Sequence, residues 1–159
     1  MAYDNRAIIR QFFDEVWSSG QLGVADELVA AGCVNHDVAS ISGDIKGVEA
    51  LKAQVREYRA AFPDLRFLMQ DLIATGDTVV ARWTATGTNR APLMDIPPTI
   101  PPTGKTTSVE GMTISRLSNG KVIESWSQWD TLKLMQNLGV AQSLGKSAAR
   151  SDAREARPG

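Results

Sequence analysis

The chain has 159 residues, of which 43% are hydrophobic and 22% are charged. These values fit one globular domain with its own core and are too few for two ordinary domains. The net charge is −1 and Cys33 is the single cysteine, so we expect no disulfide, no metal site and no nucleic-acid partner. The sequence has no apolar run of membrane length, and its N-terminus is unlike a signal peptide. These features favour a cytoplasmic protein with no membrane partner.

The first third of the chain carries helical patterns. Apolar residues recur every three to four positions over 8–17, after a potential cap at Asp4 or Asn5. A second, short helix is expected over 22–31, and a third over 48–62, where Pro63 ends it. Within these stripes Phe13, Trp17 and Tyr58 are expected mainly as core, and they are candidates for cavity walls.

Between the second and third helices lies the segment Cys33-Val34-Asn35-His36-Asp37-Val38. The simple interpretation is a turn that follows the end of a helix. The alternative is that Asn35 or His36 reaches into a pocket as a hydrogen-bond donor or an acid/base group. A lone histidine without a neighbouring cysteine or second histidine is poor evidence for a metal.

From residue 65 the apolar period changes from 3.6 to 2, which predicts strands over 65–72 and 78–87. Arg82 lies in the middle of the second strand. If its side chain faces inward it needs a carboxylate, for which Glu124 or Glu110 is a candidate; if outward, it is an ordinary surface charge. A proline-rich stretch over 89–104 then repeats Ile-Pro-Pro-Thr twice, and it is expected to be stiff and extended. It either covers a cavity mouth or another subunit, or is a solvated connector.

Residues 106–130 predict a hairpin whose loop contains the Asn119-Gly120 pair. With a three-residue loop, one face of this hairpin carries Glu110, Met112, Ile114, Arg116, Val122, Glu124, Trp126, Gln128 and Asp130. Because that face mixes carboxylates, an arginine and a large aromatic ring, we predict that it is the floor of a polar-lined pocket. A solvated face is the alternative.

The end of the chain predicts a short helix over 132–138 and a mobile tail over 142–159, which is small and charged without an apolar period. Helices followed by strands and a last short helix indicate one α+β domain over 1–141. A curved antiparallel sheet against helices leaves a conical cavity, and such cavities commonly bind ligands.

The hairpin and the loop before it resemble the SnoaL-like polyketide cyclases, which belong to the nuclear transport factor 2-like superfamily. The resemblance covers about 7–140 and is carried by Gly87-Thr88-Asn89, Ile-Pro-Pro-Thr-Gly-Lys, Glu110-Gly111-Met112, Arg116, the run 119–124, Trp126, Asp130 and 136–139, and in the first half by Phe12, Trp17, Gly20 and 35–37. It implies a cone-shaped α+β barrel in which a curved, mainly antiparallel sheet wraps around N-terminal helices, and a homodimer through the outer sheet face. It also implies an aspartate acid/base, matched by Asp130, and an asparagine, matched by Asn35.

The resemblance leads us to expect acid/base chemistry without a cofactor on a small hydrophobic carbonyl compound, by intramolecular aldol cyclisation or by isomerisation. Asp130 would remove a proton next to the carbonyl, and Asn35 and His36 would stabilise the enolate. The expected substrate-binding residues are Trp126, Met112, Glu110, Arg82, Trp17, Phe13 and Tyr58. Two alternatives remain open: a non-catalytic small-molecule binding protein, and an epoxide hydrolase that uses Asp130, Arg82 and a second aspartate.

Overall fold

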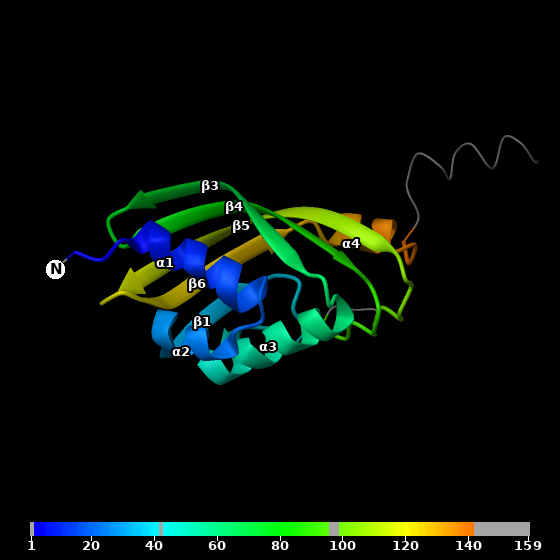
Figure 1. The fold of residues 1–159 in the computed structure, drawn as a ribbon, viewed down its shortest axis with the longest axis horizontal. Helices are drawn as coiled ribbons and strands as arrows, with labels where there is room; N and C mark the ends of the chain where they lie inside the picture. The colour runs from blue at the N-terminus through cyan, green and yellow to red at the C-terminus, as the bar shows by residue number, and fades with distance from the viewer. Residues whose placement is uncertain (1, 42, 96–98, 142–159) are drawn as a thin grey trace, which may run out of the picture.

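A curved six-stranded sheet wraps around the helices in the computed structural model, which describes residues 2–41, 43–95 and 99–141 (Figure 1). The predicted α+β class is confirmed. In chain order the elements are α1 (Asn5–Gln11), the π-helical segment η1 (Phe12–Trp17), α2 (Leu22–Leu28), β1 (Val29–Asp37), β2 (Ile45–Lys46), α3 (Val48–Ala61), β3 (Arg66–Thr75), β4 (Thr78–Thr88), β5 (Thr106–Ser118), β6 (Lys121–Trp129) and α4 (Thr131–Asn137).

The sheet has the strand order β2-β1-β6-β5-β4-β3. The contact between β1 and β6 is parallel, and every other neighbouring pair is antiparallel. Because β2 and β3 are free edges, the sheet is open and does not close into the expected barrel. The sheet leaves one concave face, which the helices cover.

The helices follow the apolar stripes of the sequence. Asp4 caps α1 by accepting a hydrogen bond from the backbone N–H of Ala7 at 3.1 Å. In α3 the stripe buries Val48, Leu51 and Val55 against the sheet. Burying a side chain of this size contributes roughly 1.5–3 kcal/mol, so these stripes hold the helices over the concave face.

Strand β1 was missed by the sequence analysis, which favoured a turn over 33–38 and extended α2 to residue 31. In the structure α2 ends at Leu28 and β1 runs to Asp37. Cys33 is buried as expected, but Asn35 and Asp37 also face inward, into a cavity. Polar residues on the inner face hide a strand pattern, because the alternation of apolar and polar side chains is then lost.

The hairpin register also differs from the prediction. Asn119 and Gly120 both have positive φ, at 49° and 75°, so they form a two-residue turn rather than a three-residue loop. A bulge in β6 then places Arg116 opposite Glu124. An extra residue in one strand reverses the facing of everything beyond it, so Val122 faces inward while Glu124 faces outward.

The proline-rich segment is held at both ends. Asn89 is fully buried, and its Oδ1 accepts from the backbone N–H of Thr103 at 2.6 Å. Leu93 and Ile100 pair through their backbones and are both buried, so this part of the loop packs on the core. Residues 96–98 of the repeat and the predicted tail over 142–159 lie outside the described residues. None of the described helices is long and apolar enough to span a membrane.

Candidate functional site

A cavity of about 100 Å³ lies between the concave face of the sheet and the helices. An apolar cavity of about 150 Å³ takes up benzene, so this space suits a small ring or a narrow chain. The expected wall residues Phe13, Trp17 and Tyr58 all line it. Further apolar or aromatic walls come from Phe12, Leu51, Phe62, Phe67, Trp83, Val109, Val122, Trp129 and Leu134.

Small polar residues form part of the sheet side of the cavity. Thr113 and Ser115 on β5 and Ser125 and Ser127 on β6 line it. The Thr113 Oγ1 atom accepts from Trp83 Nε1 at 3.1 Å and lies 3.0 Å from Ser127 Oγ. Small side chains here leave room for a ligand that Val or Leu would fill, which explains why this face does not look like a core in the sequence.

Asp37 gathers polar partners at one end of the cavity. Its Oδ1 accepts hydrogen bonds from the backbone N–H of Ala39 at 3.0 Å and from Trp129 Nε1 at 3.2 Å. Its Oδ2 accepts from Gln54 Nε2 at 3.3 Å. Asp95, from the proline-rich segment, lies on the far side of the same Gln54 amide. This end of the cavity therefore holds a carboxylate with three donors around it.

Burial raises the pKa of Asp37 above its ordinary value. The hydrogen bonds from Ala39 and Trp129 lower this pKa, and the negative charge of Asp95 raises it again. Burial also raises the pKa of Tyr58 well above its usual range, so this phenol keeps its proton and donates to Asp95 Oδ2 at 3.3 Å. A carboxylate whose pKa is raised toward neutrality is suited to act as a general base.

Asn35 lies two residues before Asp37 on the same face of β1, so the two side chains are roughly 6–7 Å apart along the strand. The hydroxyl of Ser125 donates to Asn35 Oδ1 at 2.8 Å, which sets the orientation of the amide. Within the described part of the chain, the Nδ2 amino group has no hydrogen-bond partner. Asn35 therefore offers a donor to a ligand oxygen a short distance from the Asp37 carboxylate.

Asp130 does not lie in the cavity, contrary to the prediction. Its side chain is exposed and accepts from the backbone N–H of Lys133 at 2.9 Å, which caps α4. The bulge in β6 turns Trp129 inward, and the chain leaves the sheet at the next residue. An N-cap role occupies the carboxylate and leaves it in water.

The pocket floor predicted from the hairpin is the outer face of the sheet. Glu110 is exposed, Met112 is 55% exposed, and neither lines the cavity. Arg82 faces the same way, and its Nε lies 2.6 Å from Asp71 Oδ2, not beside either of the proposed glutamates. Trp126 is also outside, so the inward-facing indole of β6 is Trp129. The sequence analysis chose the face with the larger and more charged residues, but a cavity requires the face with the smaller ones.

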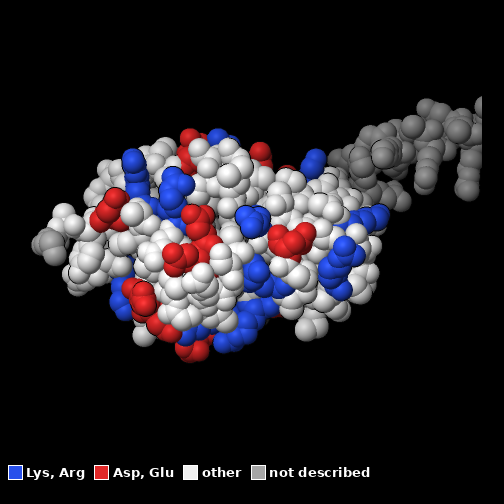
Figure 2. All heavy atoms as spheres, viewed as in Figure 1, with Lys and Arg blue, Asp and Glu red and all other residues white. Residues whose placement is uncertain are grey.

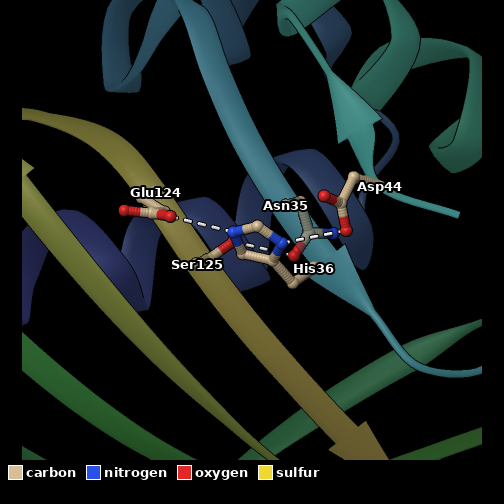
Figure 3. A network of polar contacts seen from close by, with 5 residues as sticks. All are labelled: Asn35, His36, Asp44, Glu124 and Ser125. Atoms are coloured by element: carbon tan, nitrogen blue, oxygen red, sulfur yellow. Dashed lines mark hydrogen bonds and ion pairs between the residues drawn. The ribbon is translucent and has the colours of Figure 1, made fainter.

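His36 points away from the cavity. Figure 3 shows its ring between two carboxylates, with Nδ1 at 2.9 Å from Asp44 Oδ1 and Nε2 at 2.8 Å from Glu124 Oε1. The ring stacks on Trp126 with centroids 5.4 Å apart, and the guanidinium of Arg116 lies 5.0 Å from the Trp126 ring centre. His36 does not line the cavity, since strand alternation places its side chain on the other face of β1 from Asn35 and Asp37.

The His36 ion pairs predict a pH-dependent stability. Hydrogen bonds to Glu124 first and Asp44 second raise the His36 pKa above its ordinary value of about 6.5. The stabilisation is therefore fully present below the unfolded-state pKa and is lost as pH rises through the folded-state pKa. We expect H36N to lower the melting temperature more at about pH 5.5 than at about pH 8.5. Thermal unfolding of wild type, H36N and the exposed control D77N tests this, and an equal loss at both pH values would contradict it.

Sequence reasoning missed Asp37, Gln54, Asp95 and Trp129 as site residues. One signal was present: Asn35 and Asp37 are spaced by two, which places both on one face of any strand. Gln54 and Asp95 carry no such signal, because α3 and the proline-rich segment meet β1 only in the folded chain.

Acidic and basic side chains are interspersed on the face shown in Figure 2. Single-sign patches mark binding sites for polyelectrolytes, and this face has none.

Known proteins share this fold. The chain aligns with solved structures of a SnoaL-like cyclase from Jannaschia sp. CCS1 (25% identity, 86% of this chain and 92% of that one, TM-score 0.75) and of IdmH from Streptomyces antibioticus (28%, 86% and 99%, 0.73), which is assigned to the polyketide cyclases. A protein from Acidithiobacillus ferrooxidans with the same assignment is 33% identical over 89% of this chain and 99% of its own, with a TM-score of 0.72. None of the curated proteins matches the chain.

The family comparison agrees with these structural matches. The model of the SnoaL-like polyketide cyclases matches residues 7–138, which is most of the chain. This match covers more than half of the chain and therefore establishes the family. This chain belongs to the SnoaL-like polyketide cyclase family.

Proposed function

We propose that this protein is an acid/base enzyme that removes a proton from the carbon next to a carbonyl in a small hydrophobic substrate, with Asp37 as the base. The observation that carries the proposal is a carboxylate with a raised pKa at the polar end of an apolar, aromatic-lined cavity. Sites that combine an apolar pocket with a titratable group of perturbed pKa are characteristic of proton-transfer chemistry.

Asn35 supplies the second requirement of this chemistry. When the C–H bond breaks, its proton moves to Asp37 and its electron pair moves to the carbonyl oxygen as an enolate. The Asn35 Nδ2 amino group lies within one small molecule's length of Asp37, and it is the donor that we assign to this oxygen. The enolate then either attacks a second carbonyl of the same molecule, which gives a cyclised product, or is protonated at another carbon, which gives an isomer.

Deuterium exchange tests the proposal without knowledge of the natural substrate. The protein is incubated in D₂O with a panel of small cyclic ketones and β-keto esters, and loss of the proton next to the carbonyl is followed by NMR. We expect exchange above the buffer rate for wild type, and a rate lowered about 10²-fold or more in N35A, the range seen when an oxyanion donor is removed. A panel that binds in the cavity but never exchanges would favour the non-catalytic binding protein and sink the enzyme proposal.

We also propose that the outer sheet face joins two copies of the chain. A row of apolar side chains crosses four strands at one level: Ile73, Val80, Ile114 and Trp126. Ile73 is 61% exposed and Ile114 is 42% exposed, and sheets commonly pack face to face through such rows. The pairs Arg82–Asp71 and Arg116–Glu124 flank the row on either side, so a two-fold axis can bring opposite charges together.

Sedimentation velocity tests the dimer. We expect wild type to sediment as a dimer and I114K to sediment as a monomer. A dimer of I114K would bury one lysine charge from each copy in the apolar interface, which is unfavourable. L132K, which replaces an exposed residue of α4, is the control and should remain dimeric. A monomeric wild type at about 100 μM would remove the proposal, since obligate sheet interfaces persist well below that concentration.

A further inference from the structure

Two carboxylates meet at a single amide at the polar end of the cavity. Gln54 Nε2 lies 3.3 Å from Asp37 Oδ2 and 3.5 Å from Asp95 Oδ2. Asp37 ends β1, Gln54 lies on α3 and Asp95 follows β4, so three elements far apart in the sequence converge on this point. The two carboxylate oxygens are thus joined through one NH₂ group.

Among the described residues, the hydrogen-bond partners of the two acids are all uncharged. Asp95 is 6% exposed and Gln54 is 5% exposed. The groups that face the two acids are the Tyr58 hydroxyl from α3, the Ser40 hydroxyl at 2.9 Å from Asp95 Oδ1, and the Trp129 N–H from β6. Glu57 is the other charged neighbour and is negative too. None of the ion pairs in the described residues involves either aspartate.

Asp95 is buried and Asp37 is half-buried, and two negative charges in such surroundings repel each other more strongly than they would in water. A negative charge beside a carboxylate disfavours its ionised form, so the charge of Asp95 favours the protonated form of Asp37.

We propose that Asp95 is a positioning residue, whose negative charge beside the shared Gln54 amide makes Asp37 a stronger base. The proposal rests on the proposed function only in taking Asp37 as the group that receives the substrate proton. Asp95 does not line the cavity and acts through its charge on Asp37.

The orientation of Gln54 gives independent support. Its Nε2 faces both acids, so its Oε1 is turned away, and this oxygen is buried without a hydrogen-bond partner. A buried acceptor left unpaired is unfavourable for folding, and natural proteins tolerate this mainly where a functional arrangement requires it. Here the arrangement that requires it is the shared donor between two acids.

The negative charge of Asp95 affects catalysis through its effect on Asp37. With Asp95 ionised nearby, Asp37 binds a proton more tightly, so it accepts one from carbon more readily. Replacing Asp95 by Asn keeps the size and removes the charge. The pKa of Asp37 should then move down toward the ordinary range of aspartate, and the acid limb of any pH–rate profile should move with it to lower pH.

NMR titration of protein labelled with ¹³C at the aspartate carboxyl carbons tests the pair directly and needs no substrate. We expect the midpoint of the Asp37 carboxyl signal to lie at lower pH in D95N than in wild type. S40A is the matched control, because it removes a hydrogen bond from Asp95 but leaves the charge, and its Asp37 midpoint should stay close to wild type. Backbone amide spectra establish that each variant is folded.

The outcomes separate this proposal from the proposed function. An Asp37 midpoint that is the same in wild type and D95N overturns the positioning role of Asp95, even if deuterium exchange is observed. A midpoint that moves as expected, in a protein that exchanges no substrate proton, supports the pair and rejects the enzyme. If S40A moves the midpoint as far as D95N does, the effect comes from local structure rather than charge, and the proposal fails.

Discussion

Replacing Asp37 by Asn is expected to lower the deuterium-exchange rate by about 10²- to 10⁴-fold, the usual contribution of a positioned general base. Asparagine keeps the size and the Oδ1 acceptor for Ala39 and Trp129, but it cannot accept a proton at pH 7. The loss should therefore fall on the rate of proton removal and leave ligand binding close to wild type.

Asp130→Asn is the matched control for this experiment. Asn caps helices about as well as Asp, so D130N should keep the bond to the Lys133 N–H and change the exchange rate little. Comparing D37N with D130N also decides between the two aspartates that the chain offers, one chosen from the family pattern and one from the geometry. A large loss in D130N with none in D37N would reverse the assignment.

The stability of D37N also tests whether Asp37 is a functional residue rather than a stabilising one. Burial raises the folded-state pKa of Asp37, so the ionised form is disfavoured by folding. The contribution of this group is favourable below its unfolded-state pKa and is lost as pH rises through the folded-state pKa. We therefore expect D37N to melt at or above the wild-type temperature at pH 7, whereas a residue selected for stability would give a lower value.

The second large effect is expected at Gly111, which lies on β5 between two tryptophans. A Cβ at this position would stand 2.5 Å from Trp83 Cζ2 and 2.7 Å from Trp129 Cβ. Both indoles line the cavity, and Trp129 donates to Asp37. We expect G111A to lower the free energy of unfolding by about 1–3 kcal/mol, as overpacked cores do.

G111A should also reduce the exchange rate, because the displaced Trp129 no longer holds the Asp37 carboxylate. Urea unfolding followed by tryptophan fluorescence measures the stability change. The control is G23A in α2, where an added Cβ meets nothing within 4 Å and the helix gains up to about 1 kcal/mol. If G111A proves as stable as wild type, the close packing of the two indoles on this glycine is wrong.

The sequence was informative where local patterns match the fold. The stripe over 48–62 predicted α3, the alternation over 78–87 predicted β4, and Asn119-Gly120 predicted the hairpin, because in each case the apolar residues lie on the side that packs on the core. The same patterns predicted an α+β domain, and the residues of the hairpin predicted the family.

The site was predictable only in part. Phe13, Trp17 and Tyr58 lie on a helical stripe that faces the core, so their place on the cavity wall follows from periodicity. The direction in which the hairpin side chains face does not follow from periodicity. The bulge in β6 adds one residue that no local pattern predicts, and this residue places Trp126 outside the cavity and Trp129 inside it.

By itself the sequence determined the helices, the strands from β3 to β6 and the family, since the apolar residues of these elements are regularly spaced along the chain. Only the tertiary structure decided which aspartate lies in the cavity, because that depends on which face of β1 and β6 the sheet turns toward the helices. It also brought Asp95 beside Asp37, which are 58 positions apart in the chain, and contacts at such separations leave no trace in local periodicity.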